Sequence, residues 1–183
     1  AMMKWISISA AVLLTTAAAG QVEREVSATD IGGFAGNRID KNKEHYIKTF
    51  PIGQYIKLIE ERSFTAWDWR QGEQPGKWLE SAILTSARTH DVALDKEAHA
   101  MFERIIKSQA TDGYVGITSQ AVRTPEKPLR GMDAYELYFL QHALLTAYEV
   151  WKDTRGLSAA RKLGDYFLHY IGPGKAEFWP SAV

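Results

Sequence analysis

The feature that most constrains the fold is a helical pattern that occurs twice, about 60 residues apart. In residues 94–109 the apolar side chains recur at intervals of three and four, which predicts a helix with a single buried stripe. The pattern returns in residues 157–171, where Leu163 stands 62 positions after Met101. No stretch shows the alternation that is typical of a strand. The sequence therefore predicts an all-α fold built from repeated helical hairpins.

Residues 132–151 differ from these two segments because they are apolar nearly all round. A helix of that kind is expected to be buried on both sides, whereas a helix with one apolar stripe lies on the outside. Two further helical segments are predicted, residues 76–89 and a broken one over residues 43–61. Inner and outer helices that alternate through short corners, such as those at Asp91 and Asp153, indicate an α/α toroid or an α-solenoid.

The first 42 residues precede the repeat. Residues 1–19 show a short positive start, an apolar run and a small-residue end, which is typical of a secretory signal peptide. The run is too short and too rich in serine and threonine to predict a membrane span. A buried N-terminal helix is the alternative. Residues 20–42 contain a glycine-rich breaker and are expected to form an extended lead-in without a helix of its own. We therefore expect a protein exported to the periplasm or the extracellular space.

The composition narrows the classes of partner. Lys plus Arg and Asp plus Glu both total 22, so the net charge is zero and no basic stripe predicts nucleic acid binding. The sequence has no cysteine, which removes disulfides, thiolate metal sites and cysteine nucleophiles from this chain. It also contains no His-Glu-x-x-His, Gly-x-Gly-x-x-Gly, Walker or Gly-x-Ser-x-Gly pattern, so no metalloprotease, nucleotide or serine-hydrolase site is indicated.

Polar and aromatic residues gather in the two long connections, residues 67–76 and 112–131, that lead from an outer helix into the next inner one. Such loops are expected to line the mouth of a toroid, where a ligand binds. Carboxylate, amide and indole groups at the start of a helix suit a polar ligand such as a sugar, and helix caps or core packing are the alternatives. The residues predicted to lie near the cavity are Glu73, Lys77, Trp78, Asp112, Tyr114, Asp133, Tyr135, Glu136 and His142.

Two of these residues raise a question of chemistry. Cleavage of a glycosidic bond requires paired carboxylates, one acting as an acid and the other as a base or nucleophile. Glu73 and Glu136 are candidates by residue type, but the sequence does not fix their separation. His142 stands in the middle of the inner helix, where it either packs in the core or faces a ligand.

Four motifs follow one another in an order that resembles the N-terminal part of the β-L-arabinofuranosidase-like glycoside hydrolases, family 127 and its relatives. The resemblance covers about residues 30–172 and implies an (α/α)6 barrel that acts on glycans, usually exported from bacteria. It also implies that Tyr135, Glu136 and His142 belong to the sugar pocket, with Glu73 and Lys77 positioning the sugar rather than catalysing. The motifs are Gly32-Gly33-Phe34-Ala35-Gly36-Asn37-Arg38, Gly72-Glu73-Gln74-Pro75-Gly76-Lys77-Trp78-Leu79, Gln109-Ala110-Thr111-Asp112-Gly113-Tyr114-Val115-Gly116, and Tyr135-Glu136-Leu137-Tyr138 through His142.

The chain departs from the family in one respect. In the family the acid/base glutamate and a zinc-bound cysteine nucleophile lie further along the chain, at positions that have no counterpart here. A barrel of six hairpins needs twelve helices, whereas this sequence predicts four helices and a broken one. Residues 43–183 are therefore expected to be the N-terminal part of the catalytic domain, with no catalytic residue or cofactor and with any zinc bound in the missing C-terminal part. The expected partner is an oligo- or polysaccharide, with no nucleic acid and no stable membrane span, and the oligomeric state is left open.

Two other interpretations stay open on the sequence. One is a non-catalytic helical-repeat module that binds a carbohydrate or a protein. The other is a different α/α-toroid sugar enzyme, such as an epimerase or an unsaturated uronyl hydrolase, which would share the architecture but not the order of the motifs.

Overall fold

A computed structural model describes residues 31–65, 72–130 and 132–176. The predicted signal peptide and residues 67–71 of the 67–76 connection lie outside the described residues. Within these ranges the chain forms no strand and makes only two isolated bridges, so the all-α prediction is confirmed. The elements are α1 (Gly33–Asn42), a π-helical turn η1 (Lys43–Ile47), α2 (Ile52–Glu61), α3 (Gln74–Thr89), α4 (Val92–Ser108), a 3-10 turn η2 (Gln120–Val122), α5 (Asp133–Trp151) and α6 (Thr154–Tyr170).

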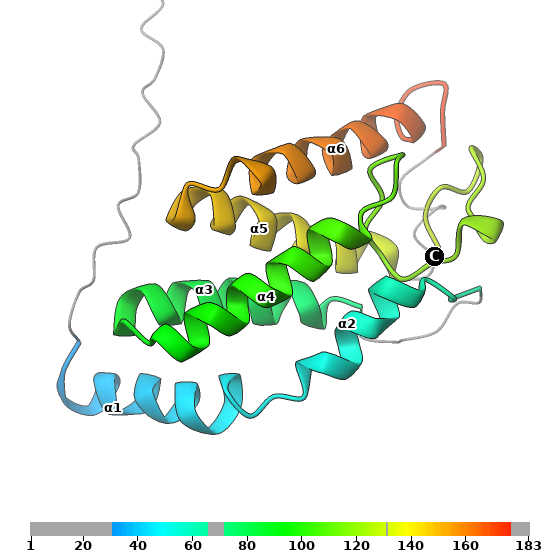
Figure 1. Cartoon of the computed structure of the whole chain (residues 1–183). Helices are drawn as coiled ribbons and strands as arrows, with labels where there is room; N and C mark the ends of the chain where they lie inside the picture. Colours follow the sequence, from blue (N-terminus) through cyan, green and yellow to red (C-terminus); the bar gives the residue numbers. More distant parts are fainter. Residues whose placement is uncertain (1–30, 66–71, 131, 177–183) are drawn as a thin grey trace, which may run out of the picture.

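The helices lie in three successive tiers, α1 with α2, α3 with α4, and α5 with α6 (Figure 1). The inner helices α3 and α5 pack closely along each other, and α4 and α6 lie on their outer side. Gly76 permits this close approach, because a Cβ there would meet the carbonyl carbon of Phe139 at 2.5 Å. This arrangement of inner and outer helices is that of part of an α/α toroid.

The predicted 62-residue repeat is present in the backbone. The inner helices α3 and α5 end on His90 and Lys152, which both adopt the left-handed conformation, with φ of 53° and 58°. The next residues, Asp91 and Asp153, both cap an outer helix through a side-chain oxygen, as aspartate does at helix N-termini. The outer helices α4 and α6 begin at 92 and 154 and end at 108 and 170. The turn between the inner and the outer helix therefore has the same geometry in both hairpins.

The core lies between the inner and outer helices and matches the predicted apolar stripes. On α4 the stripe that includes Phe102 is buried, and the indole of Trp78 on α3 is buried against η1, where its Nε1 donates to the Ile47 carbonyl at 2.8 Å. In the described ranges no helix combines the length and apolar character that a membrane span requires. The larger buried side chains include Ile56, Ile59, Leu79, Ile83, Leu94, Phe102, Ile105, Leu137 and Leu140.

One prediction about the lead-in is wrong. Residues 33–42, expected to be extended, form α1, which continues directly into η1. The glycines begin this helix instead of breaking it. Gly33 starts it with φ of 65°, a value that favours glycine, and Gly36 is its single buried residue. The six residues after Gly36 contain no proline or glycine, and they continue the helix.

A second prediction is also wrong for the described part of the chain. Helix α5 was expected to be buried on both sides, yet Tyr135 and Tyr138 are 41% and 53% exposed. The opposite side, with Leu137, Leu140 and Leu144, has no exposed surface. Both sides carry apolar groups, so the sequence could not distinguish the side that packs against α3 and α6 from the side that no described element covers.

Candidate sugar-binding face

The N-termini of α3 and α5 lie beside each other, so both long connections arrive at one end of the hairpins. The backbone N–H of Gly72 donates to Oε1 of Glu136 at 3.0 Å, and Nζ of Lys77 lies 3.0 Å from the hydroxyl of Tyr135. These contacts join residues 64 and 58 positions apart. They set the two inner helices in register and bring several predicted residues together.

Lys77 is the polar centre of this end. Its ammonium lies 4.9 Å from the ring centroid of Tyr135 and 4.4 Å from that of Phe139, and it is 3.6 Å from Oε1 of Glu73. Cation–π contact and an ion pair hold the lysine on the inner side of α3 and α5. The lysine in turn orients the tyrosine hydroxyl.

A second contact group continues along the same side of α5. Nδ1 of His142 lies 3.8 Å from Oε1 of Glu80 on α3, and its ring lies 4.5 Å from the ring of Tyr138. His142 is exposed, so the structure places it on the open side of the inner helix and not in the core. We call Lys77, Glu80, Tyr135, Tyr138 and His142 the α3–α5 face.

Glu136 lies beneath this face and is only 2% exposed. Burial and the negative charge of Asp133 raise the pKa of its carboxyl to about 7, and the hydrogen bond from Gly72 opposes the shift. A Cβ at position 72 would lie 2.3 Å from Oε2 of Glu136, so the glycine allows the loop to approach the carboxyl. A carboxyl with this pKa is partly protonated near neutral pH.

Asp133 is the centre of a buried network under the 112–131 loop. Its Oδ1 accepts hydrogen bonds from the hydroxyl of Tyr114 and, at 3.1 Å, from that of Thr118. Its Oδ2 accepts from the backbone N–H of Arg130 at 2.8 Å. Burial raises the pKa of Asp133 to about 6 in spite of these donors. The network fixes the first turn of α5, which carries Tyr135 and Glu136.

Arg123 anchors the loop beside this network, a role that the sequence did not reveal. Its guanidinium lies 3.7 Å from the ring centroid of Tyr114, and Nη1 lies 3.1 Å from Oδ2 of Asp112 and 3.0 Å from the hydroxyl of Tyr166. It thereby ties the 112–131 loop to α6. No sequence signal marks this arginine, because Tyr166 is 43 positions away.

The predicted residues therefore separate into three groups. Lys77, Tyr135 and His142 lie on the α3–α5 face, and Glu73 and Glu136 lie buried directly beneath it. Trp78, Asp112, Tyr114 and Asp133 belong to packing and loop contacts, and Tyr114 has no exposed surface at all. Contact of any of them with a sugar stays a prediction.

The residues present do not fit the zinc that the family resemblance implies. In the described part of the chain no three His, Asp or Glu side chains are placed to hold a metal ion, and the sequence has no cysteine. A zinc–thiolate site therefore cannot be built from these residues. No chemical step is assigned to a metal here.

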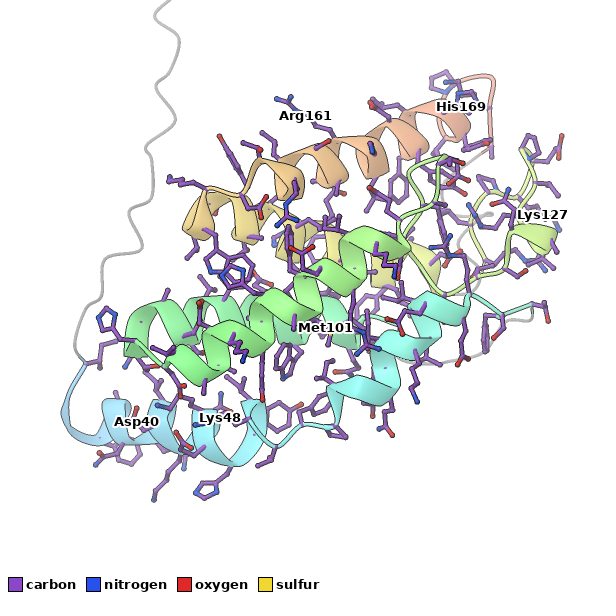
Figure 2. The ribbon with its side chains drawn as sticks, in the orientation of Figure 1. Asp40, Lys48, Met101, Lys127, Arg161 and His169 are labelled. Carbon is purple, nitrogen blue, oxygen red and sulfur yellow. The ribbon has the colours of Figure 1, made fainter. Side chains whose placement is uncertain are left out.

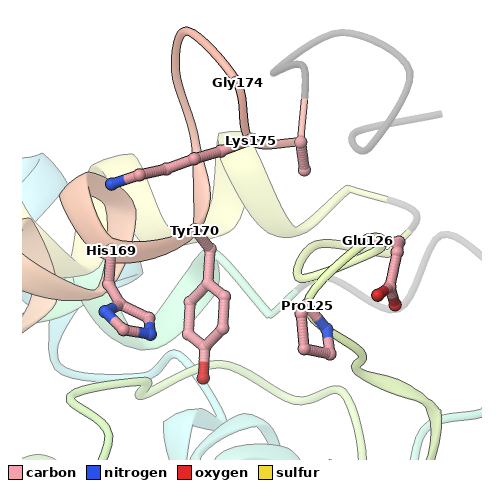
Figure 3. Close-up of a pocket in the computed structure, with 7 residues that line it drawn as sticks. Pro125, Glu126, His169, Tyr170, Gly174 and Lys175 are labelled. Atoms are coloured by element: carbon pink, nitrogen blue, oxygen red, sulfur yellow. The ribbon is translucent and has the colours of Figure 1, made fainter.

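Of two hollows near this end of the hairpins, one lies apart from the α3–α5 face and the other touches it at Lys77. One of about 610 Å³ lies at the end of α6, where His169, Tyr170, Lys175, Pro125 and Glu126 line it (Figure 3). A smaller one of about 140 Å³ lies between η1 and the start of α3, where Tyr46 and Phe50 line it together with Lys77 and Trp78. Tyr135, Tyr138 and His142 are exposed, so the candidate face is open in the described structure.

The geometry can be compared with known families. The family model of the β-L-arabinofuranosidase GH127 catalytic domain matches residues 22–178. The chain belongs to the GH127 family. Neither the search of curated proteins nor the search of solved structures found a match.

Membership in GH127 makes this chain a glycoside hydrolase domain with a glycan substrate. The matched range contains both long connections and the whole of the α3–α5 face. The family resemblance drawn from the four ordered motifs is confirmed.

Proposed function

We propose that the α3–α5 face forms one wall of the sugar pocket of a GH127 enzyme that acts on terminal L-arabinofuranosides. The observation that carries this proposal is the grouping of Lys77, Tyr135, Tyr138 and His142 on one open side of the two inner helices. Sugars are held by aromatic surfaces for their C–H groups and by a few placed polar groups for their hydroxyls, and this face offers both.

The charges on the face favour a neutral sugar. Lys77 is balanced by Glu73 at 3.6 Å, and Glu80 stands opposite His142. A site for a uronate would need an unopposed cation to pair with the sugar carboxylate. This balance favours an arabinofuranoside over the substrate of an unsaturated uronyl hydrolase.

The buried acids support the face without touching the sugar. Glu136 fixes the loop at Gly72, and Asp133 fixes the first turn of α5 through Tyr114 and Thr118. Side chains locked in this way hold Lys77 and Tyr135 in one geometry before the sugar arrives, which lowers the entropic cost of binding.

We also propose that this 183-residue chain binds the sugar without cleaving it. Two observations support this proposal. The sequence has no cysteine, and Glu73 and Glu136 are both buried, so these two residues do not form an exposed carboxylate pair. Release of arabinose from a synthetic furanoside by the chain alone would contradict it.

The binding proposal is tested by NMR titration of the chain with methyl β-L-arabinofuranoside. We expect saturable shifts at Tyr135, Tyr138 and His142, with a dissociation constant in the millimolar range for a single sugar on an open face. Replacing Tyr138 by alanine should weaken binding about five- to tenfold, since it removes one stacking surface.

The matched control is Phe34→Ala, which removes an exposed aromatic side chain from α1, away from the α3–α5 face. This variant should bind the sugar as the parent does. Equal losses in both variants, or a preference for a methyl uronide over the arabinofuranoside, would contradict the proposal.

Export is a separate proposal, supported by the signal-peptide pattern of residues 1–19. Expression of the chain with its N-terminus in a bacterium should yield a processed protein outside the cytoplasm that begins near Gly20 or Gln21. An unprocessed cytoplasmic chain would contradict it.

A further inference from the structure

Tyr114 is a predicted site residue that lies outside the α3–α5 face. It has no exposed surface, so it cannot contact a sugar directly. Its hydroxyl donates to Oδ1 of Asp133 and accepts from the backbone N–H of Thr118 at 3.1 Å. Gly116 leaves room for this hydroxyl, because a Cβ there would overlap the hydroxyl oxygen. Tyr114 can therefore act on the site through Asp133.

Two guanidinium groups lie over the ring of Tyr114. The guanidinium carbon of Arg123 is 3.7 Å from the ring centroid, and that of Arg62 is 5.6 Å from it. Arg62 follows α2, and its Nε and Nη2 donate to the carbonyls of Gly116 and Ser108. A cation over an aromatic ring is attracted to it, so both arginines hold the ring in place. Tyr114 thus joins the end of α2 to the loop that follows α4.

The backbone joins the same two segments. The N–H of Phe64 donates to the carbonyl of Ile117 at 3.3 Å, and the N–H of Ser119 donates to the carbonyl of Phe64 at 2.8 Å. The 112–131 loop, which carries Lys127, accordingly lies beside the end of α2 (Figure 2). The residues that leave α2 and the 112–131 loop therefore form one unit.

Asp133 connects this unit to the sugar face. It is the first residue of α5, and its Oδ1 accepts from the hydroxyls of both Tyr114 and Thr118. Tyr135 follows two residues later, and its hydroxyl lies 3.0 Å from Nζ of Lys77. Because the side chain of Asp133 anchors the first turn of α5, a shift of the Tyr114 hydroxyl would move Tyr135.

We propose that Tyr114 is a positioning residue of the sugar site, whose hydroxyl joins the end of α2 and the 112–131 loop to the first turn of α5 and so places Tyr135 against Lys77. The inference rests on the proposed function of the α3–α5 face. Described residues of this chain enclose Tyr114, so its role does not depend on what covers the outer surfaces of the hairpins. A binding site requires such support, because its contact groups bind well only when the side chains behind them are fixed.

Tyr166 on α6 offers a matched comparison. Its side chain is also buried, and its hydroxyl donates to the carbonyl of Pro128 and accepts from Nη1 of Arg123 at 3.0 Å. Both partners belong to the 112–131 loop, and neither is on α5. Loss of either tyrosine hydroxyl breaks buried hydrogen bonds and should lower the stability of the fold to a similar extent. Only the loss at Tyr114 should displace Tyr135.

The test compares Tyr114→Phe with Tyr166→Phe in the 183-residue chain, by NMR titration with methyl β-L-arabinofuranoside. Tyr114→Phe should weaken sugar binding about fivefold or more and should lose the nuclear Overhauser contact between Lys77 and the ring of Tyr135. Tyr166→Phe should bind as the parent does and keep that contact. Urea unfolding of both variants separates this effect from a general loss of stability.

Two variants of Thr118 keep the test independent of a folding defect in Tyr114→Phe. Thr118→Val removes the second hydroxyl that donates to Asp133 and should also weaken sugar binding, whereas Thr118→Ser keeps the hydroxyl and should bind as the parent does. The pKa of the Asp133 carboxyl, about 6 in the parent, should rise in Tyr114→Phe, because a hydrogen bond that lowers it is removed. It should not change in Tyr166→Phe.

Equal losses of sugar affinity in Tyr114→Phe and Tyr166→Phe would overturn the inference, because they would show that the two hydroxyls act through stability alone. Parent-like binding by Tyr114→Phe would overturn it as well. If the parent binds no sugar, the proposed function fails, and the contact between Lys77 and Tyr135 still decides the inference. Loss of that contact in Tyr114→Phe alone supports the inference, and its retention overturns it.

Discussion

Glu136 is the residue whose environment is hardest to reconcile with its charge. It stands one turn after Asp133 on α5 and is almost fully buried, and its described hydrogen-bond partner is the backbone of Gly72. Its pKa, raised to about 7, means that the folded protein takes up a proton that the unfolded chain releases.

A pH dependence of stability follows. The ordinary pKa of the carboxyl is 4.5 and the folded value is about 7, so the free energy of unfolding should fall as pH rises through this window and level off above it. Glu136→Gln cannot ionise, so at pH 8 it should be more stable than the parent by on the order of 2 kcal/mol, with little difference at pH 5.

Urea unfolding of both proteins at the two pH values measures this difference. Glu97→Gln, at an exposed position of α4, is the control and should behave as the parent does at both values. Equal stability of Glu136→Gln and the parent at pH 8 would show that folding does not raise the pKa of the Glu136 carboxyl.

Sequence reasoning reached some of these residues and missed others for a physical reason. Lys77, Tyr135 and His142 belong to ordered local motifs, so they were predicted near one cavity, and they do share the α3–α5 face. Arg123 and Tyr166 acquire their roles only when the 112–131 loop folds onto α6. No local pattern encodes a contact of that kind.

At the scale of helices, the sequence predicted most of the structure. The predicted segments 76–89, 94–109, 132–151 and 157–171 correspond to α3, α4, α5 and α6, with differences of at most three residues at their ends. Periodicity predicts such helices well because a buried stripe must recur every three to four residues. Helix α1 was missed, since it buries only Gly36 and therefore has no stripe.

The close packing of α3 on α5 predicts a sharp difference between two glycines. Gly76→Ala would place a methyl group 2.5 Å from the backbone of α5, so the helices must separate, at a cost of about 1–3 kcal/mol in the free energy of unfolding. Gly53→Ala in α2 meets nothing within 4 Å and should stabilise the protein by about 0.5–1 kcal/mol.

Thermal and urea unfolding of the two variants give this comparison directly. Both changes add one methyl group to a helix, so the sign of the effect reports the space available and not the helix propensity. A stabilising Gly76→Ala would mean that α3 and α5 lie further apart than described.

At the scale of the whole molecule, stability is not shared equally among the three tiers. Helix α1 packs mainly on η1 at one edge, and Phe34 on it is 81% exposed. Helices α3 and α5 pack along each other and also contact their outer helices. The tiers should therefore open at different free energies.

Native-state hydrogen exchange tests this ordering. Amides of α1 should exchange through local opening, with free energies several kcal/mol below those of the α3 and α5 amides, which exchange only when most of the molecule unfolds. Equal protection of α1 and α3 would mean that the edge helix is part of the cooperative core.

The shared corner design has a consequence for how such a protein can change its length. Because His90-Asp91 and Lys152-Asp153 present the same backbone geometry, a cut at one corner can be joined to the other without remodelling either turn. Deleting residues 92–153 would connect α3 directly to α6 through a native junction. The same register would let a duplicated block be inserted there. In this chain the backbone at the two corners is therefore compatible with the loss or gain of one whole unit of 62 residues.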